Sequence, residues 1–132
     1  MALVGDYYEY YDKRFHQLTV PIAELEELHS DCRWAEGPVW FNDGQVLIWS
    51  DIPNNRKLRW IAGGGVTVFN PDSNFSNGHT RDRQGRLISC EHGKRRVTRL
   101  EPDGKVTVIA DRHAGKKGKS PNYGVGKSDG TT

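Results

Sequence analysis

The sequence predicts an all-β chain of short strands joined by turns, and three observations lead to this prediction. Glycine and proline, 15 and 6 of 132 residues, recur along the whole chain and favour turns over long helices. Residues 106–109 and 58–60 alternate apolar and polar side chains, which is the period of a half-buried strand. A pattern that starts at Glu36 recurs from Asn77, which is 41 residues later.

Each unit of this repeat begins with a polar residue and reaches a glycine eight positions later. Glu36 is followed in this way by Gly44, and Asn77 by Gly85. An apolar strand comes next, then a basic strand with alternating residues, then a turn and a further strand rich in valine. The expected strands are 46–49, 54–61 and 66–69 in the first unit and 87–90, 93–100 and 106–109 in the second.

A third unit starts at Asn122, 45 residues after Asn77, and its glycine is Gly130. A period of this length made of short strands is typical of one blade of a β-propeller, four strands around a central channel. The sequence therefore predicts two blades and the start of a third, an incomplete ring. A β-meander with accidental internal similarity is the alternative. Residues 22–28, "IAELEEL", are expected to be extended and to form an outer strand.

The organisation predicted from these patterns is an N-terminal extension over residues 1–16 and a partial propeller domain over residues 17–132. The start, "MALVGDYYEYYDKRF", lacks the basic and apolar regions of a secretory signal. No apolar run of about 18 residues is present, so no membrane span is expected. The two cysteines do not form a disulfide framework, and a cytoplasmic location is predicted. A net charge of +2 is too balanced to indicate nucleic-acid binding.

The polar residue that begins each unit is called its head, and the three heads are the candidate site residues. The first strand of each propeller blade lines the central channel, so Glu36, Asn77 and Asn122 are expected to converge at one mouth of it. A carboxylate and amide oxygens are hard ligands that suit calcium or magnesium and tolerate manganese or zinc. A turn with a surface glutamate explains Glu36 equally well on spacing alone.

Four segments carry a resemblance to a known family. "AEGPVW", "SDIPNNR", "NGHTRDRQGRL" and "CEHGKRRVTR" occur in this order and at family spacing, within residues 17–122. In this region the chain resembles the amino-terminal part of the SMP-30/gluconolactonase/LRE-like family. Its members are six-bladed β-propeller lactonases, which include the regucalcin-like proteins of carbohydrate metabolism. The resemblance covers the first third to half of the family's domain.

The resemblance implies a metal-dependent hydrolase of sugar lactones such as gluconolactone. It implies that Glu36 is a ligand of a divalent cation, with calcium preferred and zinc or manganese as alternatives. It implies that Asn122 helps to hold metal or substrate and that Asn77 faces the channel on the substrate side. The proton acceptor would come from a later blade, so the catalytic residue is unknown here, and little or no activity is expected of this chain alone.

The chain departs from the family pattern near its end. Tyr123 stands where the family has an aspartate, and Gly124 and Gly126 replace valines, which weakens the expected inner strand. Two other hypotheses follow from the partial ring. One is a non-catalytic propeller fragment that completes a ring or self-associates through exposed blade edges. The other is a truncated product without a function of its own.

Other signals are interpreted as structural. "HAGKKGKS" is not a phosphate-binding loop, because His113 stands where that motif needs its first glycine. The basic run at residues 92–99 is taken as the solvated face of an edge strand. Cys90 is expected in the core and His92 in a turn, and the four tryptophans are assigned to blade packing in preference to a sugar platform.

Overall fold

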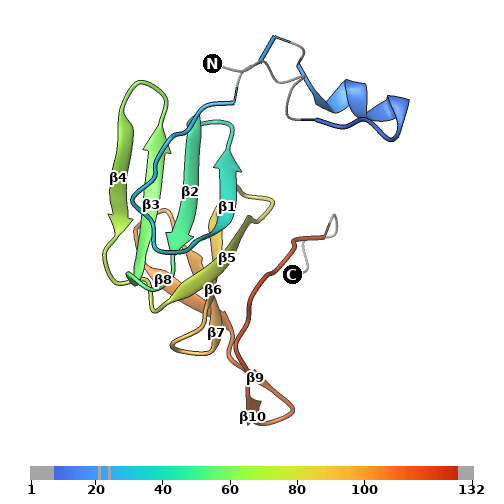
Figure 1. Ribbon diagram of the computed structural model, residues 1–132. Coiled ribbons are helices and arrows are strands. Elements are labelled where there is room, and N and C mark those ends of the chain that lie inside the picture. Colours follow the sequence, from blue (N-terminus) through green and yellow to red (C-terminus); the bar gives the residue numbers. More distant parts are fainter. Residues whose placement is uncertain (1–7, 21, 24, 128–132) are drawn as a thin grey trace. The chain divides into compact units, whose positions relative to one another are not determined.

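The fold is known from a computed structural model, which describes residues 8–20, 22–23 and 25–127 (Figure 1). The chain divides into two compact units, residues 1–30 and 31–132. The first unit contains a 3-10 helix, η2 (Lys13–Leu18), capped by Asp12, whose carboxylate accepts a hydrogen bond from the Arg14 backbone amide (2.8 Å). The outer strand expected over residues 22–28 is wrong, since the described residues of this segment form no strand. Its glutamate, alanine and leucine have little preference for extended structure.

The second unit contains two four-stranded antiparallel sheets, each with its strands in chain order (Figure 1). The predicted all-β fold is confirmed, and both sheets are meanders of the kind that form propeller blades. The first sheet contains β1 (Ala35–Phe41), β2 (Val46–Asp51), β3 (Arg56–Ile61) and β4 (Gly65–Asn70). The second contains β5 (Ser76–Arg81), β6 (Leu87–Glu91), β7 (Arg96–Leu100) and β8 (Val106–Ala110).

The internal repeat extends to the irregularities of the strands. The pairing of β1 with β2 shifts register between Glu36 and Val39, and the pairing of β5 with β6 shifts between Ser76 and His79. The pairing is therefore irregular at or directly after the head position in both of the first two units. Bulges change the direction of a strand, and they are common where a sheet builds a binding site.

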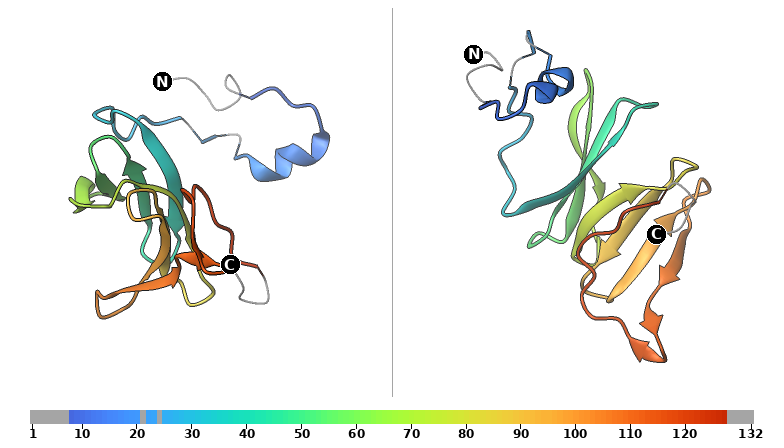
Figure 2. Two further views of the ribbon diagram at one scale, coloured as in Figure 1. Left: turned by 90° about the horizontal axis from the view of Figure 1, so that it is seen from below. Right: turned by 90° about the vertical axis from the view of Figure 1, so that its right-hand side faces the viewer.

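An apolar core lies between the two sheets. Val39, Ile48 and Leu87 are buried together, although Leu87 comes from the second sheet and the other two from the first. Phe41, Val46, Phe69 and Leu100 pack around them. Full burial of one such side chain contributes about 1.5–3 kcal/mol, so this core stabilises the pairing of the blades as well as each blade. The right-hand view of Figure 2 shows the first sheet, in green, beside the second sheet, in yellow to orange.

In each sheet, an acidic residue and an arginine form an ion pair across the tight turn between the second and third strands. Asp51 ends β2 and accepts a hydrogen bond from Arg56 Nε (2.9 Å), the first residue of β3. Glu91 ends β6 and accepts from Arg96 Nε (2.6 Å), the first residue of β7. The equivalent spacing and register show that the two blades share one design at this corner.

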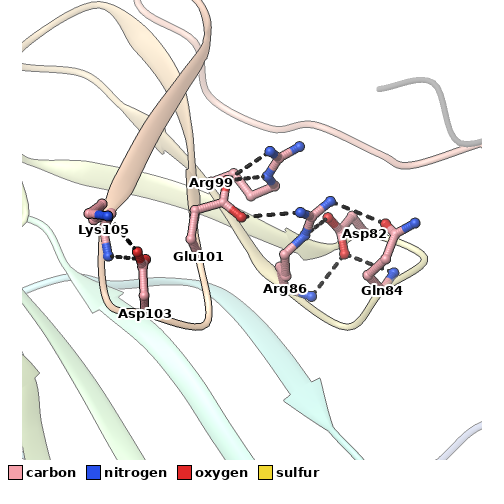
Figure 3. Close-up of polar contacts among 7 residues, drawn as sticks. All are labelled: Asp82, Gln84, Arg86, Arg99, Glu101, Asp103 and Lys105. Carbon is pink, nitrogen blue, oxygen red and sulfur yellow. Dashed lines mark hydrogen bonds and ion pairs between the residues drawn. The ribbon is translucent and has the colours of Figure 1, made fainter.

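The opposite end of the second sheet has a cluster of charges on the β5–β6 and β7–β8 turns (Figure 3). Arg86 connects the two turns, because it donates to Asp82 (2.6 Å) and to Glu101 (3.1 Å). Glu101 also accepts a hydrogen bond from Arg99 (2.8 Å). These partly exposed pairs set the spacing of the turns more than they add stability, since the free-energy gain of such pairs is small.

The chain continues from β8 through a small hairpin of β9 (Arg112–His113) and β10 (Lys116–Lys117). Residues 118–127 form no strand of their own, and Gly130 lies outside the described residues. This segment nevertheless returns along β5, where the Gly78 amide donates a hydrogen bond to the Asn122 carbonyl oxygen (2.8 Å; Figure 2). The start of a third unit thus lies beside the second, as expected, but without a sheet around it.

Within the described residues, no helix has both the length and the apolar character needed to cross a membrane.

Asp51 is expected to contribute to stability through its charge. Burial by itself would raise its pKa, but hydrogen bonds from Asn54, Arg56 and the backbone amides of Trp34 and Arg33 outweigh burial and hold the pKa below its ordinary value of 3.8. A lowered pKa means that the stabilisation is present above the pKa of the unfolded chain and is lost as the pH falls through the folded pKa. We expect Asp51→Asn to lower the free energy of unfolding at pH 7 by about 2 kcal/mol, measured by urea denaturation.

The matched control is Asp43→Asn, because the Asp43 carboxylate is 87% exposed in its pair with Arg81. That substitution should change the free energy of unfolding by less than about 0.5 kcal/mol. Asp51→Asn should also lose less stability than the wild type between pH 5 and 2. Equal losses in the two variants at pH 7 would contradict the role given to Asp51.

Candidate functional site

The candidate site begins where β1 and β5 approach each other at backbone distance. Gly37 directly follows the first head residue and has φ of +60°, in the left-handed region that favours glycine. A Cβ atom at this position would lie 2.3 Å from the carbonyl oxygen of Asn77 and 2.7 Å from Cα of Gly78. The first two heads can be neighbours only because this position has no side chain.

The second and third heads are related in the same way. Gly78 follows Asn77, and a Cβ atom at Gly78 would lie 2.4 Å from the carbonyl oxygen of Asn122 and 2.6 Å from the Tyr123 ring. The residue after the third head is Tyr123, so a large side chain stands where the first two units have glycine. The three heads therefore lie on three adjacent segments. In the third segment the head is followed by the phenol side chain of Tyr123 and not by a glycine.

One cavity of about 430 Å³ brings the predicted site residues together. Glu36, Asn77 and Asn122 all line it, although they are far apart in the sequence. Sequence reasoning placed these three at one channel mouth, and the structure places them around one hollow. The full lining is Trp34, Glu36, Ile52, Pro53, Phe75, Asn77, His92 and Asn122.

Tyr123 contacts the one acidic head directly. Its hydroxyl donates a hydrogen bond to Glu36 Oε2. This bond is the main reason that the pKa of Glu36 lies below its ordinary value, and it is also the main reason that the pKa of Tyr123 is raised. Both shifts favour an ionised Glu36 and a protonated Tyr123. The carboxylate is therefore ready to bind a cation, but one of its oxygens already has a partner.

Sequence reasoning missed two residues of this cavity. His92, expected only as a turn residue, lines the cavity, and its Nδ1 is hydrogen-bonded to Ser120 Oγ. Trp34, assigned to blade packing, is 62% exposed and also lines the cavity. No spacing rule could have found them, because they lie outside the first strands of the blades. The blade-packing assignment of Trp34 is wrong.

The donor set of the cavity suits a hard cation but is small. Glu36 supplies a carboxylate, and Asn77 and Asn122 supply amide groups, which together match the oxygen preference of calcium and magnesium. Among the described residues, no group of three or more histidine, cysteine, aspartate or glutamate side chains could hold a metal ion. The chemistry of the site therefore fits a divalent cation, while the number of charged ligands predicts weak binding.

Comparison with known families is consistent with this geometry. The sequence model described as "SMP-30/Gluconolactonase/LRE-like region" matches residues 34–132, which include both sheets and all three heads. A gluconolactonase of Zymomonas mobilis is 30% identical over 112 residues, which are 74% of this chain and 32% of that protein.

Solved structures give the same result. A gluconolactonase from Xanthomonas campestris is 39% identical with a TM-score of 0.73, over 78% of this chain and 34% of that one. A second solved structure, described as a putative gluconolactonase, is 39% identical with a TM-score of 0.75, over 80% of this chain and 37% of that one. Virginiamycin B lyase of Staphylococcus aureus, at 20% identity and a TM-score of 0.59, shares the fold. The chain spans about a third of the length of the relatives it matches.

The close approach of the first two heads can be tested with glycine substitutions. Gly37→Ala adds both left-handed strain and a clash with the Asn77 carbonyl group, so it should lower the free energy of unfolding by about 3 kcal/mol or more. Gly104→Ala is the matched control, because Gly104 has φ of +83° and nothing within 4 Å of the added atom. This substitution should lower the free energy of unfolding only by the left-handed backbone strain, about 1 kcal/mol. Urea denaturation followed by tryptophan fluorescence measures both, and equal costs would mean that the backbone contact is not limiting.

Proposed function

We propose a function that proceeds from one established fact: the chain belongs to the SMP-30/gluconolactonase/LRE-like family. The proposed activity is metal-dependent hydrolysis of a sugar lactone, carried out by the assembly to which these two blades belong. The supporting observation is that Glu36, Asn77 and Asn122, the heads of three successive units, line one cavity. The curated relative and a solved structure of a related chain are both described as gluconolactonases.

In this proposal, Glu36 holds a divalent cation through its carboxylate, and calcium is preferred because the available ligands are oxygens. A divalent cation bound there would polarise a lactone carbonyl group and lower the pKa of a water molecule. Asn77 and Asn122 orient the lactone or its hydroxyl groups through their side-chain amides, which can both donate and accept hydrogen bonds. Zinc and manganese are the alternatives.

Other residues of the cavity would position the substrate. Trp34 and Phe75 present exposed aromatic surface, 62% and 42%, on which the apolar face of a sugar ring can pack. Because His92 uses Nδ1 to contact Ser120, its Nε2 is the nitrogen left to form a hydrogen bond with substrate or water. The residue that activates the attacking water is not assigned.

Metal binding tests the first step of this proposal. We expect the chain to bind Tb³⁺, a luminescent probe for calcium sites, and Trp34 should sensitise the emission because it lines the same cavity. Glu36→Gln should abolish this signal. Tyr123→Phe should strengthen binding roughly tenfold, because it removes the hydrogen bond that competes for a carboxylate oxygen.

The two variants have different implications. If Glu36→Gln binds Tb³⁺ as well as the wild type, Glu36 is not the metal ligand and the proposal fails. If Tyr123→Phe binds more weakly, the phenol is itself a ligand and does not compete with the metal. Circular dichroism of each variant controls for loss of fold.

Activity of the chain alone is expected to be low. The cavity offers one carboxylate and no assigned proton acceptor, so hydrolysis of glucono-1,5-lactone with added calcium, zinc or manganese should barely exceed the spontaneous rate. A pH-stat assay measures this. Turnover well above background that is lost in Glu36→Ala would contradict the expected low activity while supporting the site.

The alternative function is a non-catalytic module that pairs with another chain. Val106 and Val108 favour it, since these apolar residues of β8 are 54% and 43% exposed, and β8 is an edge strand of its sheet. In size-exclusion chromatography, a defined oligomer without lactone hydrolysis would support this alternative over the enzyme.

A further inference from the structure

A buried lysine lies between the two sheets, away from the cavity that contains Glu36. Lys57 is the second residue of β3, and it is only 7% exposed. Its Nζ crosses to the second sheet and donates a hydrogen bond to Ser89 Oγ on β6 (2.9 Å). A lysine is almost never buried to this extent unless a charged partner compensates for lost hydration.

The Glu91 carboxylate does not supply that compensation directly. Glu91 acts on Lys57 only through its charge at a distance, since its oxygens accept hydrogen bonds from Arg96 Nε (2.6 Å) and Thr98 Oγ1 (3.2 Å). No ion pair to Lys57 forms within the described part of the chain. The direct partner of the amine is therefore a neutral hydroxyl group, which does not supply the opposite charge that would compensate a buried ammonium for its lost hydration.

The histidine that shares Ser89 with the amine supplies no negative charge either. His79 on β5 is hydrogen-bonded through Nδ1 to Ser89 Oγ (3.0 Å) and through Nε2 to Ser50 Oγ (2.8 Å). Burial, with help from the charge of Lys57, lowers the pKa of His79 to about 3, so the imidazole is neutral near pH 7. Burial likewise lowers the pKa of Lys57 to about 8, and the charge of Glu91 only partly opposes this.

The amine also has space in front of it. Lys57 lines a cavity of about 310 Å³ between the two sheets, which shares no lining residue with the cavity at Glu36. Neutral polar groups of the wall come from Asn70, Asn74, Ser89 and Thr98, and charged groups come from Asp72, Glu91 and Arg96, while Leu87 is one of the apolar residues. A small polar molecule with a few hydroxyl groups fits such a lining better than a large or purely apolar one.

We propose that Lys57 is a carbonyl-reactive residue and that the cavity between the sheets binds small polar aldehydes, which form an imine with its amine. The neutral nitrogen attacks the aldehyde carbon, and one N–H proton moves to the carbonyl oxygen to give a carbinolamine. Loss of that hydroxyl group with the second N–H proton releases one water molecule and leaves the C=N bond. No oxidant or reductant is consumed, so the step balances with the aldehyde alone.

Reductive trapping tests this proposal on the wild-type chain. The folded protein is treated briefly with limiting glycolaldehyde and sodium cyanoborohydride at pH 8, and each lysine is quantified by peptide mass spectrometry. Lys57 should be labelled at least about tenfold faster than Lys94 and Lys105, which are exposed, because an ordinary lysine with a pKa of about 10.4 is well under 1% neutral at this pH.

The same labelling in 8 M urea, roughly the concentration that unfolds small domains, supplies the reference in which all lysines should react alike. Lys57→Arg keeps a positive charge at the position and should remove only the fast-labelled peptide. Ser89→Ala keeps the amine and should retain labelling faster than at Lys105. A folded chain in which Lys57 reacts no faster than Lys94 and Lys105, while the unfolded chain labels all three, would overturn the proposal and leave Lys57 as a structural residue.

Discussion

The structure depends on the backbone contact between the first strands of successive blades. Gly37 lets the carbonyl group of Asn77 approach its Cα, and Gly78 does the same for the carbonyl group of Asn122. Propeller blades must converge toward an axis, and a Cβ atom at either glycine would hold the inner strands apart. The cavity with its three head residues, and the apolar core between the sheets, both follow from this approach.

Burial of polar groups between the blades is the second consequence of that contact. Ser50, His79 and Ser89 form a continuous chain of hydrogen bonds from the first sheet to the second, and Lys57 joins it at Ser89. Such groups stabilise an interface only when every member is satisfied, because an unpaired buried donor or acceptor is costly. The chain therefore fixes one register of blade against blade, which the less directional apolar core alone would not do.

Sequence periodicity predicted most of the fold, since alternation along β3 and β8 and the 41-residue offset between Glu36 and Asn77 are local properties. It also predicted which residues share the cavity, because equivalent positions of a repeat converge by symmetry. It could not predict Trp34 or His92, which reach the cavity from outside the repeated first strands. Nor could it find Lys57 in the interface, because a basic strand pattern gives no sign of which cation is buried.

Tyr123 shows how the third unit can interact with the first two without forming a sheet. In the earlier units the residue after the head is a glycine, and its function is to allow close approach. At Tyr123 the backbone of the segment is held instead by Gly78, while the side chain extends to the Glu36 carboxylate of the first blade. One short segment thus contacts both sheets, by a backbone bond to one and a side-chain bond to the other. The phenol contacts the carboxylate that the proposed cation would need, so under the proposed function the closure of this edge and cation binding at Glu36 would compete with each other.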